Sequence, residues 1–146
     1  MTTPDRAADR TADRTADRTA DWTALLADPA PVRDVLGVPA PPLTDYDLFA
    51  VHLDERENSV TLGFTAPGLP AGAADTWRER GHTAVEFFLV LTGVRDLALD
   101  GWTHEPTTSA TLTSGSALLT GARHRIAFGY DTLRVEQLRG YLTGSP

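Results

Sequence analysis

The sequence contains no cysteine and no lysine, and it has no long uninterrupted apolar stretch. Without cysteine, neither a disulfide framework nor a thiolate metal site can form. No window approaches the roughly 18 consecutive apolar residues that a membrane span needs, and no apolar segment typical of a signal peptide follows the N-terminus. We therefore expect a soluble, cytoplasmic protein that does not associate with membranes.

Charge is the second constraint. The chain has 13 basic residues, all arginine, against 20 acidic residues, so its formal net charge is −7. This acidity argues against nucleic acid as a partner, because nucleic-acid binding relies on Lys and Arg contacts to phosphates. It is compatible with a basic protein partner, although a solvated acidic surface without any partner is the simpler interpretation.

The N-terminus is a tetrapeptide repeat, one DRAA followed by three DRTA units, that ends at Asp21. In a helix, the aspartates of this repeat would be like-charged neighbours at i,i+4, which is unfavourable, and no apolar stripe is present for docking. We expect residues 1–21 to be a disordered low-complexity tail. Residues 22–146 are expected to form a single domain.

The first structured segments follow this tail. Asp21 is expected to cap a short helix over residues 22–26, and residues 32–36 add one more turn before Gly37. Residues 38–44 read VPAPPLT and are expected to be a proline-rich connector that cannot be helical.

Beyond the connector the apolar period changes to two, which is typical of strands. Residues 54–58 predict a turn between two alternating strands that bury one face and expose the other to water. Thr92-Gly93 separates two strongly apolar strands. The predicted strands are 46–53, 59–65, 85–91, 94–99, 107–113, 116–120 and 123–130, with a last short strand at Leu133 and Val135. This pattern predicts an α+β fold with about seven or eight strands, dominated by an antiparallel β-meander that is curled or two-layered.

Catalytic and metal-binding patterns are not found in the sequence. It has no nucleophile elbow and no phosphate-binding loop. Its four histidines, His52, His82, His104 and His124, show neither i,i+4 nor i,i+2 spacing. We therefore expect no catalytic residues, no metal and no cofactor, and a protein that is not an enzyme.

Acidic residues at two places predict a binding surface for a partner. Asp54, Glu55 and Glu57 cluster in the predicted turn, without the register of a calcium-binding loop. Asp45 and Asp47 lie at the other end of the preceding strand and would extend the negative surface. The alternative is an ordinary solvated hairpin tip.

Glu86 is the one charge inside the most apolar strand. If buried, its pKa would be raised, and it could be the polar handle of a small-molecule-binding β domain or a minor enzyme with a cavity in the curled sheet. Alternatively, Glu86 lies at the sheet edge or pairs with an arginine of the next strand. Trp22, Trp77 and Trp102 are interpreted as core anchors or as the rim of a groove.

The order of several short motifs resembles a known family. WTALLADP precedes a proline-rich link, a strand ending in VHLD, and a strand reading VTLGF. Trp77, Gly81-His82, an apolar strand and the strand GVRDLALDGW then follow. This order resembles the immunity protein 50 family, antidotes of bacterial polymorphic toxin systems, over residues 22–141. His82 stands where the family usually has asparagine or another polar residue, and the DRTA tail is foreign to it. The resemblance implies a non-catalytic protein that binds and neutralises a cognate toxin, and it assigns no site residues.

Overall fold

The computed structural model describes residues 21–66, 68 and 78–141 of the chain. The predicted tail, except for Asp21, and Trp77 lie outside the described residues. Two 3-10 helices and one α-helix come first: η1 (Trp22–Leu25), α2 (Ala30–Leu36) and η2 (Leu43–Asp45). The strands are β1 (Asp47–Asp54), β2 (Ser59–Ala66), β3 (Ala84–Thr92), β4 (Arg95–Asp100), β5 (Thr107–Thr113), β6 (Ser116–Gly121), β7 (Arg125–Gly129) and β8 (Thr132–Tyr141). No helix in the described part of the chain is long and apolar enough to cross a membrane.

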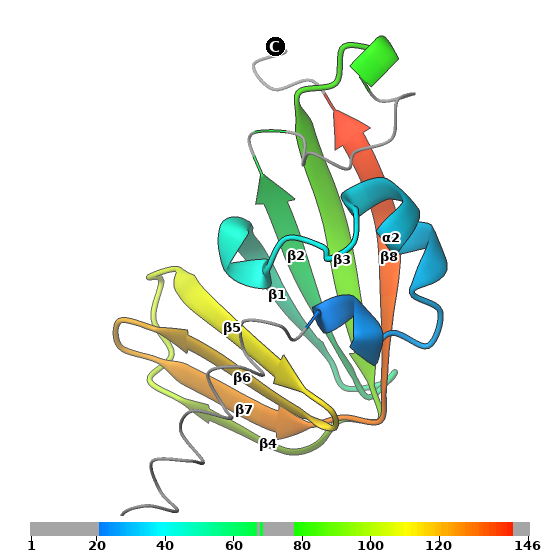
Figure 1. The fold of residues 1–146 in the computed structure, drawn as a ribbon. Helices are drawn as coiled ribbons and strands as arrows, with labels where there is room; N and C mark the ends of the chain where they lie inside the picture. Colours follow the sequence, from blue (N-terminus) through cyan, green and yellow to red (C-terminus); the bar gives the residue numbers. More distant parts are fainter. Residues whose placement is uncertain (1–20, 67, 69–77, 142–146) are drawn as a thin grey trace, which may run out of the picture.

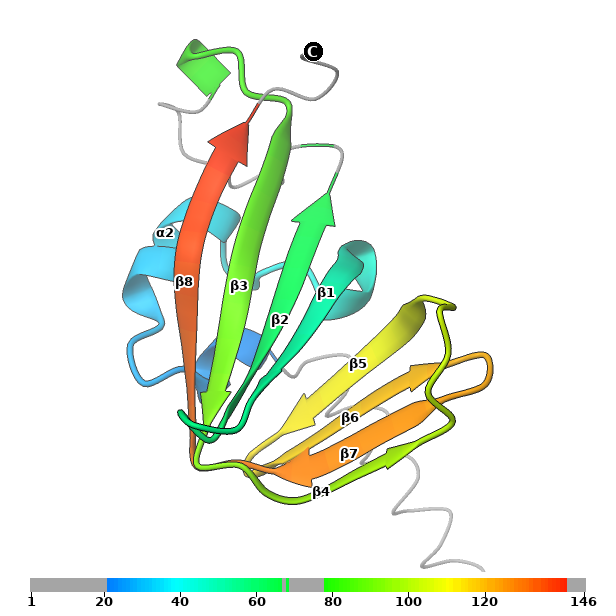
Figure 2. The same ribbon diagram turned by 180° about the vertical axis from the view of Figure 1, so that it is seen from behind.

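The strands form two four-stranded antiparallel sheets that diverge from a shared corner (Figures 1 and 2). Sheet A has the order β1-β2-β3-β8, and sheet B has the order β4-β7-β6-β5. This confirms the predicted α+β class with mainly antiparallel strands in two layers. Four of the six strand pairings join consecutive strands, as in a meander, whereas β3–β8 and β4–β7 join strands that are distant in sequence.

The corner is made by two segments that pass from one sheet into the other. β3 continues into β4 through Gly93, which has a φ of 70°, and β7 continues into β8 through Tyr130 and Asp131. The amide of Asp131 donates to the carbonyl of Thr92 at 2.8 Å, and the Asp131 carboxylate pairs with Arg95 at 2.5 Å. Strands that switch sheets at a bend are typical of sheets that pack at a large angle.

The last strand differs from its prediction. A short strand was expected around Leu133 and Val135, but β8 has ten residues and pairs with β3 along its length. The register shifts between Glu86 and Phe88, and Gln137 has a φ of 52°. This bulge breaks the period-two alternation after Val135, so the second half of the strand was not visible in the apolar pattern.

The helical segments cover one face of sheet A (Figure 1). Trp22 of η1 stacks on Phe87 of β3, with ring centroids 5.5 Å apart, and Phe87 stacks on Phe64 of β2 at 5.4 Å. Asp21 caps η1 as predicted, because its Oδ1 accepts from the amide of Thr23 at 2.9 Å. The buried aromatic stack thus fixes the N-terminal segment to the sheet.

Two local expectations need correction. The connector 38–44 was expected to contain no helix, but Leu43–Asp45 forms a 3-10 turn directly after Pro42, where a proline fits because no intrahelical N–H is required. The outer face of the β1–β2 hairpin is also not fully wet. Gly63 is buried there, because the rings of Phe49 and Phe88 cover it. A Cβ at this position would lie 2.8 Å from Phe49 Cζ and 2.9 Å from Phe88 Cε1.

Candidate binding surface

The acidic residues predicted to bind a partner lie at the two ends of β1. Asp45 ends η2 and Asp47 begins β1, and both are exposed. Asp54 ends β1, and Glu55 and Glu57 lie exposed in the turn that follows. A strand of this length separates the two groups by roughly 20 Å or more. The structure therefore does not bring the five carboxylates into one cluster. It places them in two groups, one at each end of β1.

The hairpin tip is held in a defined conformation. The Asp54 carboxylate accepts from the amide of Glu57 at 3.1 Å, and the Glu55 carbonyl accepts from the amide of Asn58 at 3.3 Å. The carbonyl of Asn58 in turn accepts from the amide of Val94 at 3.2 Å. This last bond ties the tip to the corner between the sheets, so its charges are presented by a fixed loop.

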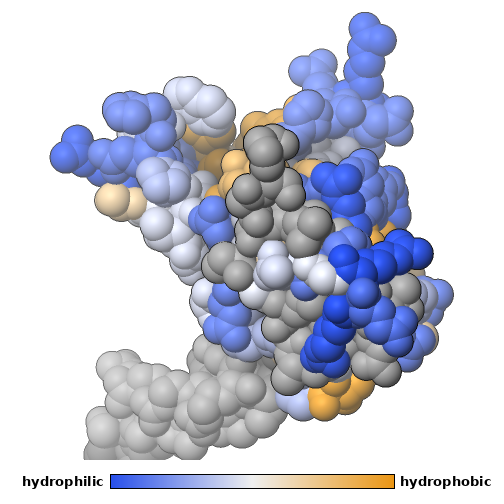
Figure 3. All heavy atoms as spheres, turned by 90° about the horizontal axis from the view of Figure 1, so that it is seen from above, coloured by the Kyte–Doolittle hydropathy of each residue, from blue (hydrophilic) through white to orange (hydrophobic). Residues whose placement is uncertain are grey.

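A groove lies between the two acidic groups, beside β1. It has a volume of about 380 Å³ and separates β1 from the loop that connects β4 to β5. β1 contributes the consecutive residues 47–51, and the far wall is formed by Leu99, residues 102–107, His124 and Ile126. Seen from above, hydrophobic side chains are exposed in the hollow between the lobe of sheet B and the body of the molecule (Figure 3).

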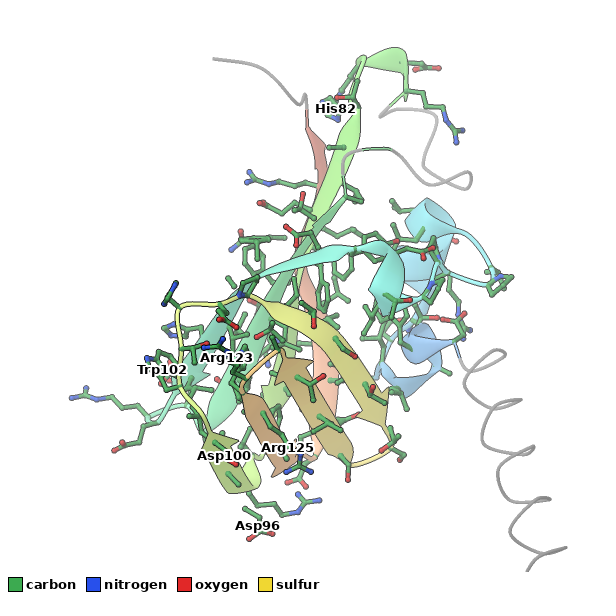
Figure 4. The ribbon with its side chains drawn as sticks, turned by 90° about the vertical axis from the view of Figure 1, so that its left-hand side faces the viewer. His82, Asp96, Asp100, Trp102, Arg123 and Arg125 are labelled. Atoms are coloured by element: carbon green, nitrogen blue, oxygen red, sulfur yellow. The ribbon has the colours of Figure 1, made fainter. Side chains whose placement is uncertain are left out.

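Half of the large apolar side chains that are exposed in the described part of the chain line this groove. Trp102 is 77% exposed, Phe49 46% and Leu99 36%, and all three line it. Leu53 of β1 and Leu97 of β4 are exposed on the same two strands. Trp102 projects from the loop after β4, beside Arg123 (Figure 4). The groove therefore carries an apolar surface that the fold itself leaves uncovered.

A second hollow, of about 620 Å³, lies on the outer face of sheet B. Its lining includes Arg95, Asp96, Thr111 and Arg125. None of the exposed large apolar side chains in the described part of the chain lines it. Its surface resembles an ordinary solvated sheet face, so the groove beside β1 is the better candidate for binding.

Glu86 pairs with an arginine of a neighbouring strand, which was the alternative to its being the polar group of a binding cavity. It lies on β3 opposite Arg139 of β8, whose Nε donates to Glu86 Oε2 at 2.8 Å and whose Nη2 lies 2.6 Å from the same oxygen. Glu86 does not line the groove. The idea of a cavity with Glu86 as its polar handle therefore has no support in this geometry.

The histidines are only partly brought together. His104 and His124 both line the groove, and His124 Nε2 lies 2.9 Å from Thr107 Oγ1. His52 is exposed on β1, and His82 lies at the end of the molecule far from Trp102 (Figure 4). Among the described residues, no group of three or more His, Cys, Asp or Glu side chains is arranged to hold a metal ion.

Sequence reasoning left the groove itself unrecognised. Trp102 was interpreted as a core anchor or as the rim of a groove, and the second interpretation fits its exposure. Trp22, by contrast, is a core anchor whose indole N–H donates to the carbonyl of Pro41 at 2.9 Å. Phe49 had been assigned to the apolar face of the hairpin, which was expected to be buried, but the structure buries the neighbouring Leu48 and leaves Phe49 exposed. Leu99 had been assigned to a strand without a role. The one available signal was a tryptophan directly after Asp100-Gly101, where a turn would carry it to the surface.

Comparison with known proteins gives the family. A family model described as Immunity protein 50 matches residues 28–139, from just before α2 to within β8. No curated protein and no solved structure matches the chain. The matched segment includes β1, the acidic tip, the groove and both sheets, and it confirms the resemblance drawn from the motif order. The chain belongs to the immunity protein 50 family.

Proposed function

We propose that this protein is a cytoplasmic immunity protein that binds a cognate toxin domain and neutralises it without catalysing a reaction. The observation that carries the proposal is the family match over residues 28–139. The acidic, fixed hairpin tip supports a protein partner over a nucleic acid or a membrane surface, because both of those carry negative charge.

Neutralising a potent toxin requires tight binding. Nanomolar affinity corresponds to about −12 kcal/mol, and an interface that supports it typically buries about 1,600 Å² in total. No single acidic tip provides that area, so the interface must extend beyond residues 54–57. Asp45 and Asp47 at the other end of β1 belong to the same proposed surface.

The charge of the protein makes a basic toxin domain the favoured partner. Residues 22–146 carry a net charge of −6, from 15 acidic residues against nine arginines. Opposite charges accelerate diffusional encounter, and this effect weakens as salt screens the charges. We therefore propose that Asp54, Glu55 and Glu57 act mainly on the association rate.

The first experiment identifies the partner. The tagged protein is used to recover bound proteins from its own host, and the C-terminal domain of any large protein encoded by the adjoining reading frame is purified and tested. The proposal predicts a stoichiometric complex and growth rescue when both proteins are co-expressed. Failure of the purified toxin domain to bind, or toxicity that is unchanged by co-expression, would contradict it.

The second experiment tests the acidic tip. Glu55→Gln/Glu57→Gln removes two exposed charges and keeps Asp54, whose carboxylate holds the turn. We expect the association rate at low salt to fall several-fold, with a smaller change in the dissociation rate. Asp28→Asn/Asp34→Asn is the matched control, because it removes two exposed charges from the N-terminal segment. Equal association rates for the two double variants would remove the tip from the proposed surface.

A further inference from the structure

We propose that the groove between β1 and the β4–β5 loop is the centre of the toxin interface, and that it receives an apolar side chain which the toxin presents among basic residues. This inference rests on the proposed function and names the surface that performs it. Its starting point is the concentration of exposed apolar side chains on β1, on β4 and at Trp102.

Trp102 has the properties of an anchor residue. Its side chain is 77% exposed in the free protein, so the fold gains little from burying it and a partner can still cover most of it. Tryptophan is enriched among the few interface residues that contribute most binding energy, and such residues lie near the interface centre. Phe49 and Leu99 extend the apolar surface from Trp102 across the groove. The groove volume of about 380 Å³ is sufficient for one or two inserted side chains.

The backbone of β1 favours insertion of a side chain over addition of a strand. β1 is one of the two edge strands of sheet A, and residues 47–51 line the groove along that edge. The register of β1 shifts between Leu48 and Ala50, which places a bulge at Phe49. Bulges interrupt the regular spacing of edge N–H and C=O groups and protect an edge against strand pairing. The partner is therefore held by side chains in the groove, with Phe49 presented by the bulge.

The charges around the groove select the chemistry of the partner. Residues 45–58, which include β1 and both acidic groups, carry five carboxylates and one arginine. On the opposite wall, Glu105 Oε1 lies 3.7 Å from the Nε of Arg123, which itself does not line the groove, so this cation is paired with an acid. An apolar centre with a charged rim is the usual anatomy of a specific interface. The rim is negative along β1, which fits lysines and arginines on both sides of the inserted apolar side chain.

The test compares two equally exposed apolar residues. Trp102→Ala removes the proposed anchor, and Val38→Ala removes an apolar side chain that is 73% exposed but does not line the groove. The probe is the purified toxin domain encoded by the adjoining reading frame, and binding is measured by surface plasmon resonance. We expect Trp102→Ala to raise Kd by about 30-fold or more, mainly through faster dissociation. Val38→Ala should stay within about twofold of the unmodified protein. Thermal unfolding of both variants should match the unmodified protein, because neither side chain is buried.

A second measurement locates the interface without any substitution. Hydrogen exchange of the complex should show new protection in residues 47–54 and 100–107. Protection confined to α2 or to the outer face of sheet B would overturn the proposal.

The outcomes separate this inference from the proposed function. If the unmodified protein binds the toxin domain and Trp102→Ala binds equally well, the groove is not the interface centre, and the immunity function still stands. If the unmodified protein does not bind the toxin domain, both proposals fail together.

Discussion

The corner between the sheets depends on a glycine that no other residue should replace without cost. Gly93 has a φ of 70°, and a Cβ built there would lie 2.7 Å from the Cβ of Asp131 and would overlap the Asp131 carboxylate. Asp131 cannot simply rotate away, because its own Cβ is part of the overlap. We therefore predict that Gly93→Ala destabilises the protein by more than the backbone conformation alone would explain.

Gly81 provides a matched control for the backbone contribution. Its φ is 75°, but among the described residues other than its chain neighbours no atom lies within 4 Å of the position that a Cβ would occupy. An alanine in this left-handed conformation costs about 1–2 kcal/mol, and the reduced entropy of the unfolded chain returns about 0.4–1 kcal/mol. We expect Gly81→Ala to lower the free energy of unfolding by about 1 kcal/mol.

The overlap adds a second contribution at Gly93. Relieving it requires a backbone shift at the corner and loss of the exposed Arg95–Asp131 ion pair, which by itself is worth only about 0–1 kcal/mol. Small-to-large changes at close contacts typically cost about 1–3 kcal/mol, so the total for Gly93→Ala is about 2–4 kcal/mol. Gly101→Ala should cost at least as much, since its Cβ would overlap the carbonyl oxygen of Arg123, a backbone atom.

Urea unfolding followed by circular dichroism measures all three variants, and their m-values must agree with that of the unmodified protein. We expect the loss in free energy of unfolding to be smallest for Gly81→Ala, larger for Gly93→Ala and largest for Gly101→Ala. The steric argument would be refuted if Gly93→Ala and Gly81→Ala lowered the free energy of unfolding by amounts within about 0.5 kcal/mol of each other, which is the usual spread for neutral substitutions.

Two further predictions concern polar side chains that are buried or partly buried. The hydroxyl of Tyr46 is buried without a hydrogen-bond partner in the described part of the chain, whereas the hydroxyl of Tyr130 donates to the carbonyl of Thr113 at 2.5 Å. Tyr46→Phe should therefore leave the free energy of unfolding unchanged or raise it, while Tyr130→Phe should lower it by about 1 kcal/mol, and the reverse order in urea unfolding would contradict this. Burial raises the pKa of Asp21, but hydrogen bonds from Thr23 and Ala40 and the charge of Arg33 outweigh it and hold that pKa below 3.8. A carboxyl group whose pKa is lower in the folded than in the unfolded protein contributes stability at pH values above its unfolded-state pKa. This contribution is lost as the pH falls through the folded-state pKa. Asp21→Ala should thus cost about 1 kcal/mol at pH 7, and the difference in melting temperature should shrink below about pH 4; a difference that is constant from pH 7 to pH 3 would exclude this role.

Much of the local structure was predictable because it follows from neighbouring residues. Period-two alternation, together with the apolar segments on either side of Thr92-Gly93, located the strands from β1 to β7 to within about two residues. The side chain of Asp21 is suited to a helix N-cap, and it does cap η1. The pairing of Glu86 with an arginine was one of the anticipated alternatives, since a charge inside an apolar strand requires a partner. The motif order was sufficient to suggest the family that the comparison then showed.

The candidate site was less predictable. The acidic tip at 54–57 was visible as a run of turn residues, but its attachment to Val94 through Asn58 depends on a contact between two turns. The groove was not visible at all. Phe49 and Trp102 are far apart in sequence, and neither residue type indicates exposure, because most such side chains are buried in a core.

The sequence by itself determined where β1 to β7 lie and which residues along them are apolar, because these properties depend on the local order of the side chains, and it specified the distribution of charge along the chain. The tertiary structure alone decided that β3 pairs with β8 and β4 with β7. It also decided that β1 stays an edge strand and that Trp102 stays uncovered. Antiparallel pairing between distant strands is selected by the joint burial of several apolar faces, and no local pattern specifies that combination.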